Sequence, residues 1–307
     1  MNVSEFTSVN DATDSLVSMS QAFSDLSKID IIDKLNNIGN NFSISTSELA
    51  ESLQKSSGTL KVAGNTIDEA IALTTAGNSI LQDPSTVGTG LKMISLRLTG
   101  TKQAAEELVE LGEDTDSMIT TQSKLRSTIM EATKVASNGF AGFDILDNKG
   151  NYKSTYEIML GIAEIYKEIQ EQDKELGQQN ANLLLETVAG KNRSSVAAAI
   201  FQNPELLRDV YKSVQSSSGS AQVENSKYLD SITGKIQIMK NHIQEIENMI
   251  LNSQGLKTIL DLVNLILSGI TSILDKTGAL GTVLGSITSM VLMKKDMGVF
   301  DFISQLK

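Results

Sequence analysis

Few side chains in this sequence have the chemistry of a catalytic site. The chain contains 1 His and 0 Cys, so a nucleophile activated by histidine would have to be built around His242. No serine lies in a Gly-x-Ser-x-Gly motif. His242 stands beside Ile243 in an apolar pattern of helical period, and we interpret it as a flanking helix residue. These residue types argue against a hydrolase with a catalytic triad.

Two short stretches resemble ligand-binding loops but lack essential positions. Asp144 to Gly150 resembles a calcium loop, yet with Gly150 as the sixth residue Ile145 and Lys149 fall on ligand positions one and five. Gly190-Lys191 lacks both the earlier glycine and the following Ser or Thr of a phosphate-binding P-loop. We therefore expect no metal and no cofactor.

Paired carboxylates are the remaining candidates for acid–base chemistry. Nothing in the sequence around Glu106-Glu107 or Glu245-Glu247 suggests the burial that raises the pKa of a carboxyl group. We interpret both pairs as solvated helix faces and expect that the protein is not an enzyme.

Composition indicates a mainly α-helical fold. Only 2 Pro, 0 Trp and 4% aromatic residues stand among 307 residues of which 40% are hydrophobic and 21% charged. The absence of Cys excludes a disulfide framework and fits an intracellular or virion setting. A net charge of -11 argues against nucleic-acid binding. The first ten residues carry neither a basic region nor an apolar run, so no secretory signal is expected.

The first part of the chain predicts one amphipathic helix from Ser8 to Asn36. Its apolar residues recur every three or four positions in a narrow stripe: Val9, Ala12, Leu16, Met19, Phe23, Leu26 and Ile29. Such a stripe fits a helix packed on the following core, and it equally fits the seam of a coiled coil.

Helix start and stop signals then divide the chain into short helices. Ser45 with Glu48 and Thr66 with Glu69 are capping boxes, and Asp83-Pro84 places a cap before a first-turn proline. Four glycines fall where helices should stop, namely Gly64, Gly77, Gly100 and Gly112. The pattern predicts helices near 45–62, 66–82, 84–99, 102–111 and 120–137, with short connections that favour antiparallel neighbours.

The stretch from Phe143 to Phe201 has the most specific pattern. It predicts an extended piece closed by a turn at Gly150, and then a helix capped by Ser154 and Glu157 with an apolar stripe of Ile158, Ile162, Ile165, Tyr166 and Ile169. Two short helices follow, one rich in leucine that stops at Gly190 and one over Val196–Phe201 for which Asn192 is the expected cap. A further helix is expected after Asn203-Pro204, up to the serine-rich segment Ser216–Ser220.

At these residues the chain resembles the conserved core of tape-measure proteins of long-tailed bacteriophages. The resemblance rests on the aspartate-asparagine turn that ends at Gly150, the following amphipathic helix and the Ala-Gly-Lys-Asn-Arg-Ser junction. It extends back through SISTSELAESLQKSSGTLKVAGNTIDEAIALTTAG and PSTVGTGLKMISLRLTG, and so covers roughly Asn40 to Gln215.

A heptad pattern follows the serine-rich segment and predicts a long coiled-coil helix. The expected oligomer seam consists of Leu229, Ile232, Ile236, Met239, Ile243, Ile246 and Ile250. Isoleucine in both seam registers favours a homo-oligomer of three or more chains, such as a trimer. Packing of the seam on the chain's own core is the alternative.

The last part of the chain is apolar. The run from Thr277 to Met293 has 17 residues without a charge, which is at the lower limit for a transmembrane helix. Gly281 and Gly285 form a G-x-x-x-G motif suited to helix packing in lipid. A membrane-active helical hairpin and a water-shielded bundle inside a tail tube explain these residues equally well.

The sequence thus divides into four parts. We expect an amphipathic helix over 1–38, a compact core of short antiparallel helices over 39–215, a long heptad helix over 216–255 and an apolar helical segment over 256–307. The resemblance implies a structural protein that lies in the lumen of the virion tail, sets tail length and leaves ahead of the DNA. It also implies assembly in the host cytoplasm and contact with tail-tube, tail-assembly chaperone and distal tail proteins, with host-membrane insertion on infection as a further step. A helical membrane-permeabilising toxin is the alternative function.

Overall fold

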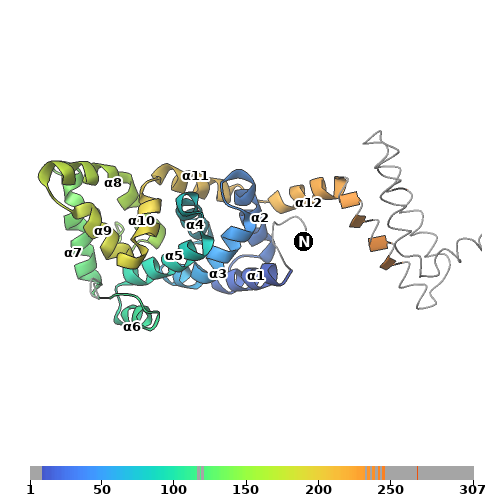
Figure 1. The fold of residues 1–307 in the computed structure, drawn as a ribbon, viewed down its shortest axis with the longest axis horizontal. Helices are drawn as coiled ribbons and strands as arrows, with labels where there is room; N and C mark the ends of the chain where they lie inside the picture. Colours follow the sequence, from blue (N-terminus) through green and yellow to red (C-terminus); the bar gives the residue numbers. More distant parts are fainter. Residues whose placement is uncertain are drawn as a thin grey trace, which may run out of the picture. The chain divides into compact units, whose positions relative to one another are not determined.

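The computed structural model describes residues 9–115, 118 and 121–231, and beyond them positions 234–235, 237–238, 241–242, 244–245 and 268. The chain divides into two compact units, Met1–Ala221 and Gln222–Lys307. The described residues are mainly helical, as the composition predicts, and form twelve α-helices and two short 3-10 helices (Figure 1). An isolated antiparallel bridge joins Leu146 to Tyr152.

The helices follow one another with short connections. In the first half of the described chain they are α1 (Val9–Ala22), α2 (Lys28–Asn41), α3 (Thr46–Val62), α4 (Ile67–Leu81), α5 (Pro84–Thr99), α6 (Lys102–Glu110) and α7 (Gln122–Thr133), which continues into η1 (Lys134–Ala136). The later ones are α8 (Thr155–Leu176), α9 (Asn180–Ala189), η2 (Lys191–Arg193), α10 (Ser194–Phe201), α11 (Pro204–Gln215) and α12 (Ser220–Asp230).

The single helix predicted from Ser8 to Asn36 is wrong, because the chain forms two helices there. α1 ends at Ala22, and Ser27 begins α2 with a capping box in which its side chain accepts from Asp30 N and Asp30 returns a bond to Ser27 N. Phe23, between them, is buried in the main core. The stripe of α1 therefore packs on the following core, and the local cap at Ser27 overrides the continuous apolar period.

The predicted helix starts in the core are confirmed at five predicted capping residues, each of which makes a side-chain hydrogen bond. Ser45, Thr66 and Ser154 each form a complete capping box with the glutamate three residues later. Asp83 and Asn203 cap α5 and α11, each followed by proline at the first helical position. The turn before α8 is also confirmed, with a positive φ of 83° at Gly150.

Two of the predicted helix boundary residues are wrong. Gly77 does not end a helix but lies inside α4, where a Cβ atom would come within 3.0 Å of the Val87 side chain of α5. Asn192 does not cap α10, because a 3-10 turn intervenes and the N-cap position falls on Arg193 without a side-chain hydrogen bond. Close packing explains Gly77 better than a helix stop does, and the 3-10 turn explains Asn192 better than a helix cap does.

Small residues let the central helices approach closely. α3 and α5 share the most extensive contact between helices of the first unit. A Cβ atom at Gly88 of α5 would lie 2.4 Å from the carbonyl oxygen of Ser52 in α3, and one at Gly90 would lie 2.6 Å from the Val196 side chain of α10. Glycine at these two positions brings α5 into contact with a helix on each side.

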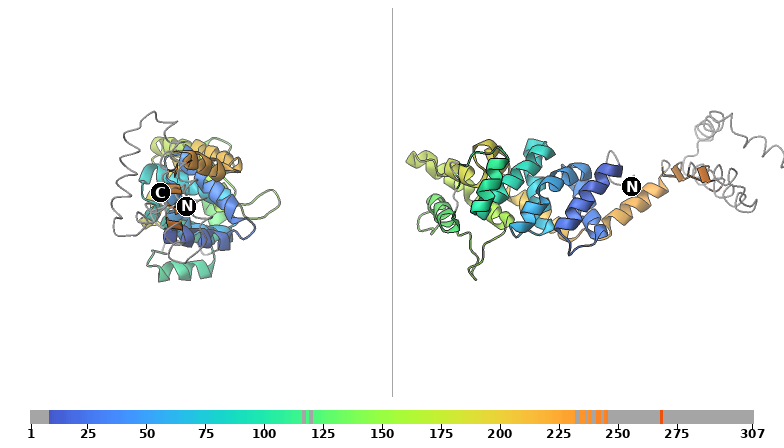
Figure 2. Two further views of the ribbon diagram at one scale, coloured as in Figure 1. Left: turned by 90° about the vertical axis from the view of Figure 1, so that its right-hand side faces the viewer. Right: turned by 90° about the horizontal axis from the view of Figure 1, so that it is seen from below.

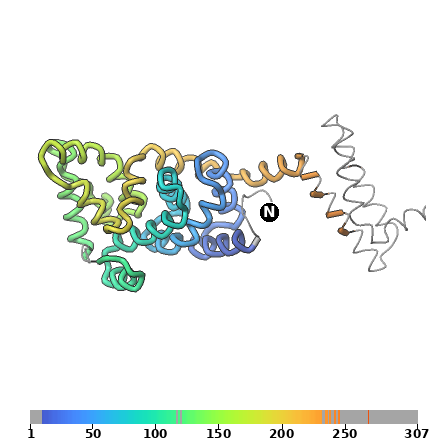
Figure 3. The backbone as a smooth tube through the Cα atoms, viewed as in Figure 1, coloured from blue at the N-terminus to red at the C-terminus, as the bar shows by residue number. Residues whose placement is uncertain are grey.

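One continuous apolar core runs through the first unit. It extends from Met19 in α1 to Val214 in α11 and includes the predicted stripe of α8, with Ile165 only partly buried. α7, α8 and α9 lie at one end of this unit and α1 and α2 at the other (Figure 1). α11 runs beside α4 and α2 (Figure 3), and α6 lies at the lower margin of the unit in the left view of Figure 2. A separate small cluster, formed by Met93, Leu96, Ala104 and Leu108, lies beneath α6.

Candidate functional site

Most residues of the predicted oligomer seam lie outside the described part of the chain. Only Leu229 is described, on α12, where 42% of its surface is exposed. Ile232, Ile236, Met239, Ile243, Ile246 and Ile250 lie outside the described residues, as do Gly281 and Gly285 of the predicted membrane-packing motif. The coiled coil, the apolar C-terminal segment, the antiparallel order of the core and the four-part division of the chain remain predictions.

The described candidate catalytic side chains make polar contacts with neighbouring residues. His242 Nδ1 lies 3.2 Å from Glu245 Oε2, and Glu107 pairs with Lys92 of α5 at 3.1 Å. Within the described ranges no group of three His, Cys, Asp or Glu side chains could hold a metal ion. No helix among those residues is both long and apolar enough to cross a bilayer.

The Ala-Gly-Lys-Asn-Arg-Ser junction encloses a buried arginine. Gly190 ends α9 with φ 71° and ψ 171°, a conformation that is essentially restricted to glycine. A Cβ atom there would lie 2.5 Å from Nη2 and 2.6 Å from Cζ of Arg97, which belongs to α5. Two features therefore require glycine at position 190: the backbone conformation and the guanidinium group packed against this position.

Arg97 is the largest fully buried side chain in the described structure. Its Nη2 donates to the carbonyl oxygen of Asp114, while Nε and Nη1 have no hydrogen-bond partner among the described residues. Burial lowers the pKa of Arg97, and the nearby carboxylates of Glu113 and Asp114 oppose that shift. The guanidinium group thus depends on the turn after α6 for its charge balance.

Glu113 joins the turn after α6 to the junction between α9 and α10. Its buried carboxylate accepts from Arg193 Nε at 2.9 Å and from Asn192 Nδ2 at 3.3 Å. Lys191 Nζ adds a longer ion pair of 3.9 Å to Asp114. The basic residues of the junction therefore make polar contacts within the first unit.

A second polar connection joins the starts of α4 and α8. Ser154 Oγ donates to Glu69 Oε1 at 3.1 Å, so a residue of the α8 capping box bonds to one of the α4 capping box. Nearby, Tyr156 N donates to Oδ1 of the buried Asn65 at 2.9 Å. Burial raises the pKa of Glu69, although its hydrogen bonds to Thr66 and Ser154 oppose the shift.

The third connection is a clamp that α2 forms on the start of α12. The buried carboxylate of Asp33 accepts from Gly219 N at 2.7 Å and from Ala221 N at 2.9 Å. Asn36 Nδ2 donates to Ser220 Oγ at 2.8 Å, and Asn37 Nδ2 donates to Ser213 O at 2.9 Å. Asp33 thereby supplies the cap that the local sequence of α12 lacks.

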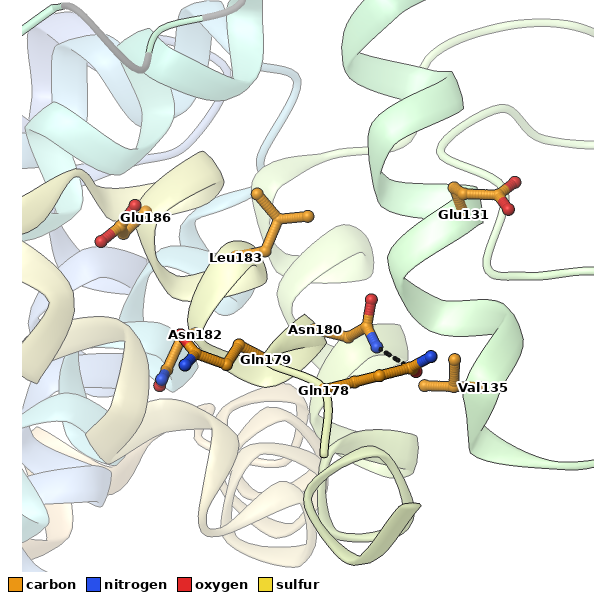
Figure 4. Close-up of a pocket in the computed structure, with 8 residues that line it drawn as sticks. All are labelled: Glu131, Val135, Gln178, Gln179, Asn180, Asn182, Leu183 and Glu186. Carbon is orange, nitrogen blue, oxygen red and sulfur yellow. Dashed lines mark hydrogen bonds between the residues drawn. The ribbon is translucent and has the colours of Figure 1, made fainter. Parts of the chain in front are cut away.

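Figure 4 shows a polar hollow of about 620 Å³ between α7 with η1 and the start of α9. Two of the residues that line it are joined by a hydrogen bond, in which Asn180 Nδ2 donates to Gln178 Oε1 at 3.0 Å. The lining residues are Glu131, Val135, Gln178, Gln179, Asn180, Asn182, Leu183 and Glu186. This lining offers amide and carboxylate hydrogen-bonding groups but no nucleophile paired with a base.

Sequence reasoning missed the clamp and the buried arginine. Asp33 and Gly219 are 186 residues apart, so no local pattern links them. The local sequence of α2 gave no signal, because Asp33 and Asn36 lie on the helix face opposite the apolar stripe of Ile31, Leu35 and Ile38. Arg97 did give a signal, because it stands among the apolar residues at the end of α5, where a buried polar group requires partners.

Comparison with known proteins assigns this arrangement to a family. The family model described as phage-related minor tail protein matches residues 1–184, which contain α1 to α8 and the turn that carries Glu113. No solved structure matches the chain. The chain therefore belongs to the family of phage-related minor tail proteins, and it is a structural protein of the phage tail.

Proposed function

We propose that the chain is a tape-measure protein, which sets the length of a phage tail and leaves the tail ahead of the DNA, and that it is not an enzyme. The clamp of α2 on the start of α12 carries this proposal. It holds Gly219 and Ala221 at the end of the first unit, in the segment that precedes the heptad pattern of Leu229 to Ile250. A compact unit followed by a heptad pattern that predicts a long helix is a suitable arrangement for a ruler.

The buried polar groups of the first unit support a mechanical role. Asp33, Glu69 and Glu113 each hydrogen-bond to another helix end or turn far along the chain. Such bonds fix helices relative to one another, and their geometry provides no group poised to attack a substrate. Membership of the tail family favours this reading over the toxin alternative.

The proposed ruler is an oligomer within the tail lumen. Seven seam positions filled by Leu, Ile and Met would expose a continuous apolar stripe on a single helix. Leu229, the described seam residue, is 42% exposed and so is available to a neighbouring chain. Sedimentation of the full chain should show concentration-dependent association, which a seam packed on its own core would prevent.

Tail length in a phage that carries an internal deletion tests the ruler. Removal of residues 230–250 deletes three heptads, including every seam position after Leu229, and keeps the flanking segments in the same heptad phase, so a helix that rises 1.5 Å per residue shortens by about 32 Å. Electron microscopy of purified tails should show that shortening. A control phage in which the same three heptads are replaced by three of different sequence should have tails of the original length. Unchanged tails in the deletion phage would contradict the proposal.

A further inference from the structure

α6 and the turn that follows it, residues 102–114, form an arm with its own small core. Ala104 and Leu108 of α6 pack on Met93 and Leu96 of α5, and Met118 packs against them. These residues are separate from the main core, whose members include Ile94 on the same helix α5. Because the arm buries few apolar side chains, its separation from α5 exposes far less surface than unfolding of the unit does.

Polar contacts hold the arm at two places. Along α6, the partly exposed ion pair between Lys92 and Glu107 has a distance of 3.1 Å, and such pairs contribute little to stability. At the turn, the Glu113 carboxylate is only 4% exposed and bonds to Arg193 and Asn192. The turn also supplies the carbonyl oxygen of Asp114 to Arg97. The stronger contacts are therefore those of the turn.

We propose that the arm opens as a local unit while the main core stays folded. We further propose that Glu113 is its catch, the residue whose hydrogen bonds keep the arm closed. Opening uncovers the apolar side chains of Met93 and Leu96 and removes one partner from the guanidinium of Arg97. It breaks only the contacts of the small cluster and the turn, whereas α3, α4 and α5 keep their contacts in the main core. This inference does not depend on the ruler.

Thiol labelling can detect the opening because the chain contains 0 Cys. Leu96→Cys places a single thiol beneath the arm, and Ile94→Cys places a matched one in the main core two residues away. In unfolded chains the two thiols should react alike. In the folded protein we expect Cys labelling at position 96 to be roughly tenfold faster or more, because it requires only the local opening. Equal rates at the two positions would overturn the proposal.

The substitution Glu113→Ala tests the role of Glu113 separately from that of the other contacts of α6. In the Leu96→Cys background, Glu113→Ala should accelerate labelling by about ten- to a hundredfold, the loss expected for hydrogen bonds to a charged group. Glu106→Ala is the matched control, since Glu106 makes only a 3.8 Å exposed pair with Lys102. Because global unfolding also breaks the contacts of Glu113, Glu113→Ala should accelerate labelling by a similar factor in the Ile94→Cys background, whereas Glu106→Ala should have little effect in either background. If Glu113→Ala has no larger effect than Glu106→Ala, Glu113 is not the catch.

Hydrogen exchange tests the same opening in the unsubstituted chain. The amides of α6 should exchange with a smaller free energy of opening than those of α3, and Glu113→Ala should lower the free energy of opening of α6. Exchange of α6 and α3 with one common free energy would contradict local opening even if a cysteine variant failed to fold.

Discussion

Gly190→Ala is the substitution that most directly tests the interpretation of the Ala-Gly-Lys-Asn-Arg-Ser junction. Gly190 ends α9 with φ 71° and ψ 171°, and its position faces the buried guanidinium of Arg97. We expect the added methyl group to destabilise the first unit by straining the backbone and by displacing that guanidinium.

The two effects have similar sizes. A non-glycine residue in this backbone region costs about 1–3 kcal/mol. Forcing a methyl group into a space where Arg97 Nη2 is 2.5 Å away requires movement of a packed side chain, at about 1–3 kcal/mol more. Together they predict a loss of about 2–6 kcal/mol in the free energy of unfolding.

Urea denaturation followed by circular dichroism measures this loss. Gly177→Ala is the matched control, because Gly177 also ends a helix at positive φ, 66°, but a Cβ atom there would meet nothing within 4 Å. That control should lose only about 1–2 kcal/mol. In an Arg97→Met background, the cost of Gly190→Ala should fall by the packing contribution of about 1–3 kcal/mol. Equal losses in Gly190→Ala and Gly177→Ala would refute the reasoning.

Two further predictions concern the buried carboxylates. Since burial raises the pKa of Glu69, the folded state binds a proton there more tightly than the unfolded state, so the free energy of unfolding should rise as pH falls from neutrality through the folded pKa toward the ordinary value. Denaturation curves should show this gain in the original chain but not in Glu69→Gln. Asp33→Ala should cost about 2 kcal/mol, because two backbone N–H groups at the start of α12 lose their acceptor. Asp30→Ala, which alters an exposed cap on the same helix, should cost less, and equal costs would count against the clamp.

Local signals predicted the helices of the first unit well, because short-range chemistry determines where these helices begin. Ser45, Thr66 and Ser154 each had their partner glutamate three residues away in the sequence. Where the prediction failed, a different local signal had been given too little weight. The capping box at Ser27 divides the helix that an unbroken apolar period had suggested.

Long-range polar contacts could not be predicted in the same way. Asp33 reaches Gly219, and Glu113 reaches Arg193, but each side chain alone fits an exposed helix or turn. Gly190 was recognised as a helix stop, whereas its second role depends on Arg97, which lies on another helix. The packing of these residues follows from tertiary structure and not from local propensity.

The most direct test of the ruler is the change in tail length per residue of the heptad segment. Phages that carry one, two or three additional copies of residues 232–238, or lack one to three heptads, keep the seam in phase and differ only in the length of that segment. If each chain lies along the tail as a continuous helix, tail length measured by electron microscopy should change linearly, by about 1.5 Å per residue. Tails of constant length across the series would contradict a tape-measure function for this chain.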